Sequence, residues 1–157
     1  MRPGSRSFVY FCLAAGFMLN LLPWSGVGLL LRPDFVLLVL LYWLIRAPHL
    51  CNIGTAWLVG MLMDLAAGGL FGQHALAYIF TAFLALLFQR RVTLFDRLQQ
   101  AGFVFALLLV YQLVLLLLKL FSGAESLGWA YFLPAVTGIL LWQIVVYSTV
   151  KLSGDKS

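Results

Sequence analysis

The chain has 157 residues, of which 64% are hydrophobic and 10% are charged, and its net charge is +5. Soluble domains carry about 25% charged residues, so this composition and a mean hydropathy of +1.04 exclude an ordinary soluble domain. The 10 basic residues are scattered near the ends of apolar runs. Such a distribution is typical of membrane insertion, and it argues against a nucleic-acid partner.

Apolar runs interrupted by Pro, Gly and charged residues predict an all-α, polytopic integral membrane protein with six transmembrane helices, in a single membrane domain over 1–157. The second and third helices are short, because 14 residues at 1.5 Å each span about 21 Å of a hydrocarbon core of about 30 Å. They are expected either to be half-buried among longer neighbours or to form a re-entrant hairpin. The expected helices cover about 7–22, 33–46, 52–68, 73–89, 98–121 and 129–151.

The basic residues favour six crossings with both termini in the cytoplasm, because cytoplasmic loops are enriched in Lys and Arg. A four-crossing alternative, with the two short helices as an outer hairpin, would leave Arg46 at membrane depth. In the six-crossing topology Arg90, Arg91 and Arg97 form a cytoplasmic basic loop. The other side receives Arg32 and Lys119, and the cytoplasmic side also receives Arg2, Arg6, Arg46, Lys151 and Lys156.

The stretch "GMLMDLAAGGLFGQHALAY" (60–78) places Asp64 among apolar and small residues. A charge at the bilayer centre costs roughly 2.5–3.5 kcal/mol, so this carboxylate is expected to have a role and a hydrogen-bonding or charged partner. Gly60, Asp64 and Gly68 are four residues apart, and small residues at this spacing let two helices approach closely. Asp64 is therefore expected to face protein. The residues expected to pack helices together are Pro33, Gly54, Gly60, Gly68 and Gly72.

A tight hairpin of the second and third helices, centred near His49, would place Asp64 level with Asp34 on the outer side. This register predicts one polar cluster that serves as a contact for a partner or a ligand, formed by Arg32, Asp34, Asp64, His74 and Lys119. Two alternatives remain open for Asp64: a structural hydrogen bond between helices, and a proton or ion path. The inner half of the membrane offers only Asn20 and Gln112, which argues against the path.

The sequence contains no pattern typical of an enzyme. No Ser-His-Asp arrangement, paired carboxylates or phosphate-binding loop is recognisable. Two distant histidines without nearby Cys or Glu do not predict a metal site, and no cofactor is expected. Cys12 and Cys51 are expected to be unreactive thiols without a disulfide framework. A protein of this kind can act only through helix faces, a pocket or short loops.

Two stretches, "LRPDFVLLVLLYW" (31–43) and "PHLCNIGTAWLVGMLMDLAAGGLFGQHALAY" (48–78), closely resemble the MreD family of rod shape-determining proteins. The recognisable motifs cover about a third of the chain, and the length, the basic N-terminus and the number of helices agree with the family. The matching positions are Arg32, Pro33, Asp34, Gly54, Gly60, Asp64, Leu65, Gly68 and Gly72.

The resemblance implies a non-catalytic scaffold subunit of the cell-elongation (rod) complex in the bacterial inner membrane. Such a subunit binds MreC and, through it, reaches MreB filaments, the glycan polymerase RodA and a class B penicillin-binding transpeptidase. It thereby supports lateral peptidoglycan synthesis and cell shape. The family is also similar in helix arrangement to the substrate-binding subunits of energy-coupling-factor transporters, which suggests an outward pocket. The alternative function is a small-molecule or lipid-binding membrane subunit of a transporter.

Overall fold

The computed structural model describes residues 5–68, 72–123, 125 and 128–154, and this part of the chain is helical without strands. The predicted all-α fold with six main helices is confirmed. These helices are α1 (Arg6–Leu21), α3 (Phe35–Arg46), α4 (Ile53–Ala67), α5 (Gln73–Val92), α6 (Arg97–Phe121) and α7 (Leu133–Gly154). A short helix, α2 (Val27–Leu31), and a 3-10 turn, η1 (Trp129–Phe132), lie between them.

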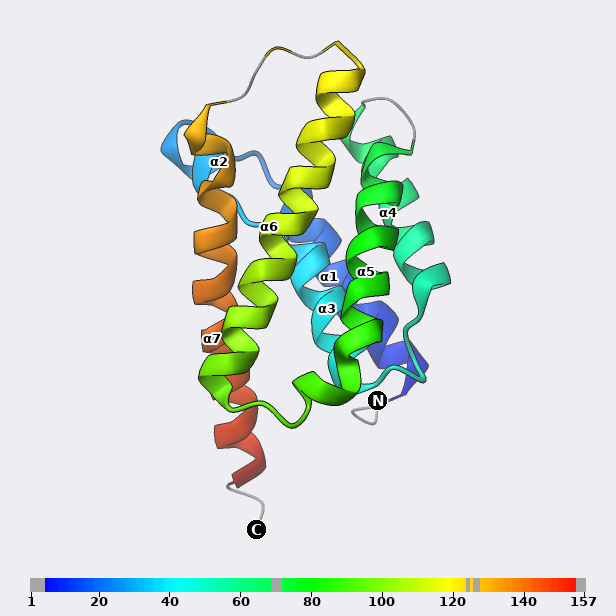
Figure 1. Ribbon diagram of the computed structural model, residues 1–157, viewed down its shortest axis with the longest axis vertical. Helices are drawn as coiled ribbons and strands as arrows, with labels where there is room; N and C mark the ends of the chain where they lie inside the picture. The colour runs from blue at the N-terminus through cyan, green and yellow to red at the C-terminus, as the bar shows by residue number, and fades with distance from the viewer. Residues whose placement is uncertain (1–4, 69–71, 124, 126–127, 155–157) are drawn as a thin grey trace.

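The six main helices run up and down between two ends of a bundle (Figure 1). The start of α1, the end of α7 and the turns at 47–52 and 93–96 lie at one end, which we call the termini end. The short helix α2, the start of α5 and η1 lie at the other end, which we call the far end. Within the described ranges, three segments are long and apolar enough to cross a membrane: α5, α6 and the stretch Trp129–Thr149. The remaining main helices are apolar and shorter.

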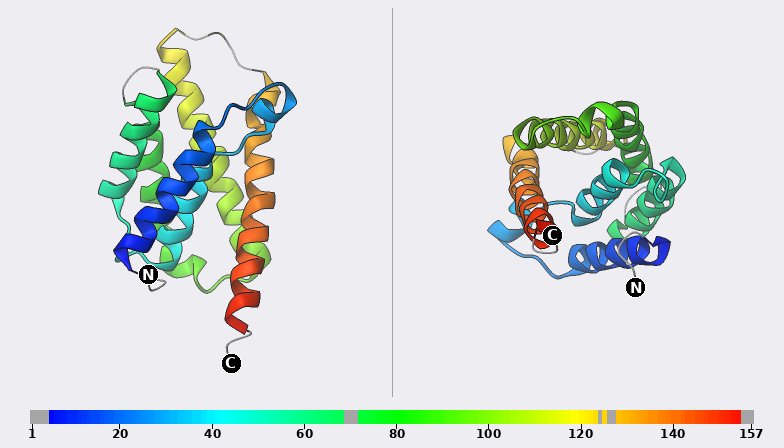
Figure 2. Two further views of the ribbon diagram at one scale, coloured as in Figure 1. Left: turned by 180° about the vertical axis from the view of Figure 1, so that it is seen from behind. Right: turned by 90° about the horizontal axis from the view of Figure 1, so that it is seen from below.

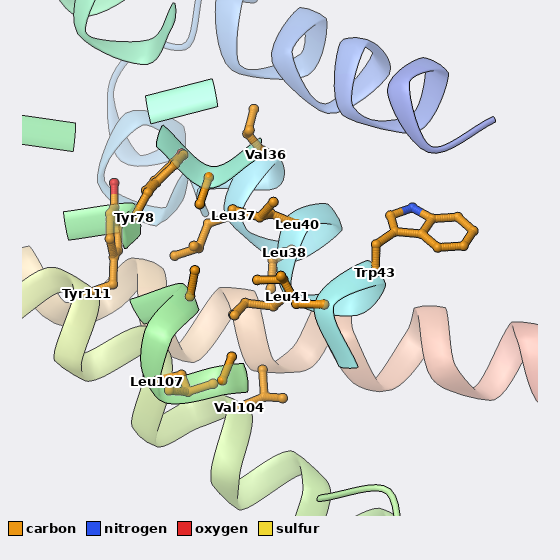
Figure 3. Packing of buried hydrophobic residues seen from close by; sticks show 14 of the residues in the cluster. Val36, Leu37, Leu38, Leu40, Leu41, Trp43, Tyr78, Val104, Leu107 and Tyr111 are labelled. Carbon is orange, nitrogen blue, oxygen red and sulfur yellow. The ribbon is translucent and has the colours of Figure 1, made fainter. Parts of the chain in front are cut away.

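The short helix α3 lies at the centre of the bundle and is enclosed by the other main helices (Figure 2). It packs against α1, α5 and α7. Most of its side chains are buried, because the sequence "FVLLVLLYWLIR" is apolar on every face. Figure 3 shows these side chains meeting residues from α5 and α6. The expectation of a short helix buried among longer neighbours therefore holds for α3.

The predicted tight hairpin of α3 and α4 differs from the structure, because the close neighbour of α4 is α5, and α3 approaches α4 less closely. Gly60 explains this choice of neighbour. A methyl group at Gly60 would lie 2.5 Å from Cα of Ala75 and 2.9 Å from its backbone nitrogen. Only a residue without a side chain lets the two backbones approach this closely. Gly60 thus has the helix-packing role that its spacing predicts.

The other glycines of this region have different roles from the predicted helix packing. Gly68 (φ 66°) ends α4 and Gly72 (φ 98°) precedes α5, and both have a left-handed backbone that favours glycine. Neither has an atom within 4 Å of the place a side chain would occupy. Gly54 lies against the side chain of Asn52, which caps its own helix. Pro33 is buried and faces Gly138 of α7, which agrees with a packing role.

The start of α3 also differs from the prediction by two residues. The helix begins at Phe35, because the side chain of Asp34 accepts a hydrogen bond from the backbone nitrogen of Leu37 at 3.1 Å. Asp34 is thus the N-cap residue, which satisfies one of the free N–H groups of the first turn. This role fixes the position of the Asp34 carboxylate at the far end of the bundle.

Candidate functional site

Asp64 lies in the last turn of α4, and its carboxylate binds the start of α5. It accepts hydrogen bonds from the backbone nitrogens of Gly72 (2.8 Å), His74 (2.8 Å) and Ala75 (3.3 Å). Its Oδ1 also lies 2.9 Å from Nδ1 of His74. Asp64 is therefore a cap supplied by a neighbouring helix.

These hydrogen bonds explain why a carboxylate is tolerated in an apolar segment. Asp64 is 2% exposed, and burying an unpaired charge is costly. The first N–H groups of a helix lack partners and carry a positive partial charge, so they satisfy a carboxylate well. Four hydrogen bonds fill the lone pairs of the two oxygens. The geometry supports the structural alternative for Asp64.

Asp34 forms a second, partly buried site with donors from four parts of the chain. Its Oδ2 accepts hydrogen bonds from the hydroxyls of Tyr78 (2.6 Å) and Tyr111 (2.8 Å). Its Oδ1 accepts from Leu37, as described above, and from the amide of Asn20 at 3.2 Å. The two tyrosine rings lie side by side in Figure 3, with centroids 5.4 Å apart. This carboxylate ties α1, α3, α5 and α6 together at the far end.

Asn20 connects this second site to the linker before α3. Its side-chain oxygen accepts a hydrogen bond from the backbone nitrogen of Phe35 at 3.4 Å, and its backbone oxygen accepts from Arg32 at 3.1 Å. Its amide also lies 3.7 Å from the sulfur of Met63. The expected place of Asn20 in the inner half of the membrane is therefore wrong, because it lies at the same level as Asp34.

The five residues of the predicted polar cluster do not form one network. Asp64 pairs with His74, whereas Arg32 reaches Asp34 only through Asn20. The two carboxylate sites are neighbours all the same. The ring of His74 lies edge-on to the ring of Tyr78, with centroids 6.4 Å apart, and Tyr78 binds Asp34.

A cavity of about 440 Å³ opens beside these two sites at the far end. Its walls come from α1, the α2–α3 linker, α4, α5, α6, η1 and α7. Four residues of the predicted cluster line it, namely Arg32, Asp34, His74 and Lys119, while Asp64 does not. The ammonium group of Lys119 lies 5.6 Å from the centre of the Tyr131 ring, also in the wall.

Asn20 and Gln112 are predicted to lie in the inner half of the membrane, whereas both line this cavity. The sequence alone does not single out Tyr78, Tyr111 and Tyr131. A polar residue inside an apolar helix is a usable signal, since such residues are rare in membrane segments and face the bundle interior. Tyr78 lies one helical turn after His74, which places both rings on one face of α5. The predicted basic loop lies elsewhere, with Arg90, Arg91 and Arg97 exposed around the α5–α6 turn at the termini end.

The fold and the site define a polytopic helical membrane protein that has a polar cavity at one end of its bundle. The family model for "rod shape-determining protein MreD" matches residues 2–151. A rod shape-determining protein MreD from Haemophilus influenzae is 31% identical over 140 residues, which cover 87% of this chain and 83% of that protein. The chain belongs to the MreD family of rod shape-determining proteins. No solved structure matches it, so the similarity to energy-coupling-factor subunits stays a prediction.

Proposed function

We propose that this protein is a non-catalytic scaffold subunit of the bacterial rod complex, held in the inner membrane. It binds MreC, and through MreC it reaches MreB filaments, RodA and a class B penicillin-binding transpeptidase, thereby supporting lateral peptidoglycan synthesis. The observation that carries the proposal is the match to the MreD family over nearly the whole chain.

The use of the buried polar groups supports a scaffold. Asp34 and Asp64 each accept four hydrogen bonds from within the chain. Carboxylates whose lone pairs are filled hold helices in place and are poorly suited to proton transfer or metal binding. The protein is left with outward helix faces as its main means of contact with other membrane proteins.

The distribution of basic residues supports cytoplasmic termini. Six basic residues of the described chain lie at the termini end: Arg6, Arg46, Arg90, Arg91, Arg97 and Lys151. Only Arg32 and Lys119 of this part lie toward the far end. Cytoplasmic loops carry the excess of Lys and Arg, so the cavity would open on the periplasmic side.

The outward faces of α4 and α7 are two of the apolar surfaces that the bundle offers to a partner helix. The exposed large residues on α4 are Ile53, Trp57, Leu58, Leu62 and Leu65, and those on α7 are Leu133, Val136, Leu140, Ile144, Val145 and Tyr147. The face that contacts lipid tolerates a larger apolar residue, whereas a face that contacts a partner does not, because packed interfaces resist added volume.

The test is affinity purification of the tagged protein from its host in a mild detergent. Wild type is compared with Leu62→Trp on α4 and Leu140→Trp on α7, and the co-purifying proteins are identified. We expect MreC and wall-synthesis proteins with wild type, and their loss from one variant that is produced at the normal level. Absence of wall-synthesis proteins from the wild-type sample would contradict the scaffold function.

The alternative function, a ligand-binding subunit of a transporter, draws support from the cavity, whose size lies in the range of small-molecule sites. The same purification distinguishes the two functions. A transporter subunit would bring an ATPase module with the wild-type protein, and a scaffold would not.

A further inference from the structure

The far-end cavity contains two buried polar groups that have no partner within the protein. They are the side-chain oxygen of Gln112, a residue only 7% exposed, and the hydroxyl of Tyr131. In the described part of the chain these are the only buried side-chain nitrogen or oxygen atoms without a hydrogen bond, and both residues line this cavity. Buried polar atoms in native proteins nearly always have partners. Their coincidence in one cavity points to a ligand that supplies the missing bonds.

The charges around the cavity favour an anion. Asp34 keeps its negative charge, but its acceptor positions are filled by four neutral donors, and within the described residues it forms no direct ion pair with Arg32 or Lys119. Lys119 is half-buried and forms no ion pair within the described residues. Arg32 uses one N–H group to bind a backbone oxygen, and a guanidinium has five such groups. Two cations therefore remain to bind a negatively charged group.

The positions of these groups describe an elongated ligand. Lys119 and Gln112 lie on the same helix, two turns apart, which is about 10 Å along the axis. The charged end of the ligand would lie near Lys119 and Arg32 at the mouth. Its hydrogen-bonding end would reach past Tyr131 to Gln112, whose free oxygen requires a donor such as a hydroxyl. The volume of about 440 Å³ accommodates a small organic molecule or a lipid head group and excludes a folded partner.

We propose that this cavity binds a phosphorylated polyol, with its phosphate between Lys119 and Arg32 and its hydroxyls hydrogen-bonded to Tyr131 and Gln112. A phosphate accepts several charge-assisted hydrogen bonds at once, which matches two separate cations. The same chemistry occurs in free glycerol 3-phosphate and in the head group of phosphatidylglycerol, and the experiment distinguishes these two sources.

Binding is measured by native mass spectrometry and thermal unfolding of the full-length protein in a neutral detergent. The probes are sn-glycerol 3-phosphate, phosphatidylglycerol and phosphatidylcholine, which has a phosphate but no net negative charge. One bound equivalent of glycerol 3-phosphate identifies a free phosphate ligand, and binding of phosphatidylglycerol alone identifies a lipid head group. The proposal is overturned if neither binds, or if phosphatidylcholine binds as tightly as phosphatidylglycerol.

Three variants locate the binding site. Lys119→Gln is expected to weaken binding about tenfold or more, because it removes a charge-assisted hydrogen bond. Gln112→Leu is expected to weaken binding by a similar factor, and Tyr131→Phe removes the other unpartnered group if Gln112→Leu does not fold. Lys151→Gln, an exposed lysine at the other end of the bundle, is the matched control and leaves binding unchanged. Wild-type affinity in the folded cavity variants would overturn the proposal.

This inference is independent of the scaffold function. A protein that recruits its membrane partners but binds none of the probes refutes the ligand and leaves the scaffold standing. A protein that binds a probe but recruits no wall-synthesis proteins refutes the scaffold function and supports the ligand site.

Discussion

Replacing Asp64 by alanine is expected to destabilise the protein by about 3–5 kcal/mol. The substitution removes the acceptor for three backbone N–H groups of α5 and for the ring of His74. A buried donor left without a partner costs about 1–3 kcal/mol, and the two backbone bonds of 2.8 Å account for most of the loss. The total stability of a domain is only about 5–15 kcal/mol, so this loss is severe.

The measurement is the free energy of unfolding, obtained by titrating the purified protein with SDS in mixed micelles and following helix content by circular dichroism. Asp64→Asn keeps one acceptor oxygen and is expected to lose about half as much stability as the alanine variant. Asn52→Ala is the matched control, since Asn52 caps α4 at an exposed site, and such a cap contributes about 1 kcal/mol. The reasoning is refuted if Asp64→Ala costs no more than Asn52→Ala.

Three further outcomes test the packing and the chemistry of other positions. Gly60→Ala is expected to lower the unfolding free energy by about 1–3 kcal/mol in the same titration, because it overpacks the contact of α4 with α5. Gly102 has open space around it, so Gly102→Ala should stabilise α6 by up to about 1 kcal/mol. Equal effects of the two substitutions would contradict the close approach of α4 and α5. Tyr111→Phe removes one donor to Asp34 and should lower the unfolding free energy by about 1.5–3 kcal/mol; an unchanged value would mean that this bond is dispensable. Burial raises the pKa of the Cys51 thiol to about 11, so little thiolate exists at pH 7. Maleimide labelling of Cys51 at pH 7 should therefore be slow until SDS unfolds the protein; rapid labelling of Cys51 in the folded protein would refute this expectation.

The positions of the helices could be predicted well from the sequence. Long apolar runs ended by Pro, Gly or charged residues leave few other choices, and α6 and α4 begin and end within one residue of the prediction. The predicted start of α3 is two residues too early, because a proline is acceptable in a first turn, whereas the capping role of Asp34 depends on its side-chain conformation. The packing partners of each helix are harder to predict, because a short connection does not force two helices into close contact.

The partners of the buried carboxylates could be predicted only in part. The spacing of Gly60 and Asp64 indicates a face turned toward protein, and this holds. The predicted partners of Asp64 are charged side chains, whereas its main donors are backbone N–H groups, which no residue type reveals. Asp34 obtains its donors from Asn20, Tyr78 and Tyr111, residues from three other helices. Contacts between residues of different helices depend on the tertiary arrangement and produce no local pattern in the sequence.

The bond between α4 and the start of α5 also bears on how the chain enters the membrane. α4 is synthesised first, and in lipid its carboxylate would be an uncompensated charge. The donors that neutralise it belong to residues 72–75, which the ribosome adds afterwards. We therefore expect α4 to wait at the translocation channel until α5 has begun to form, so that the two helices pass into the bilayer as a pair.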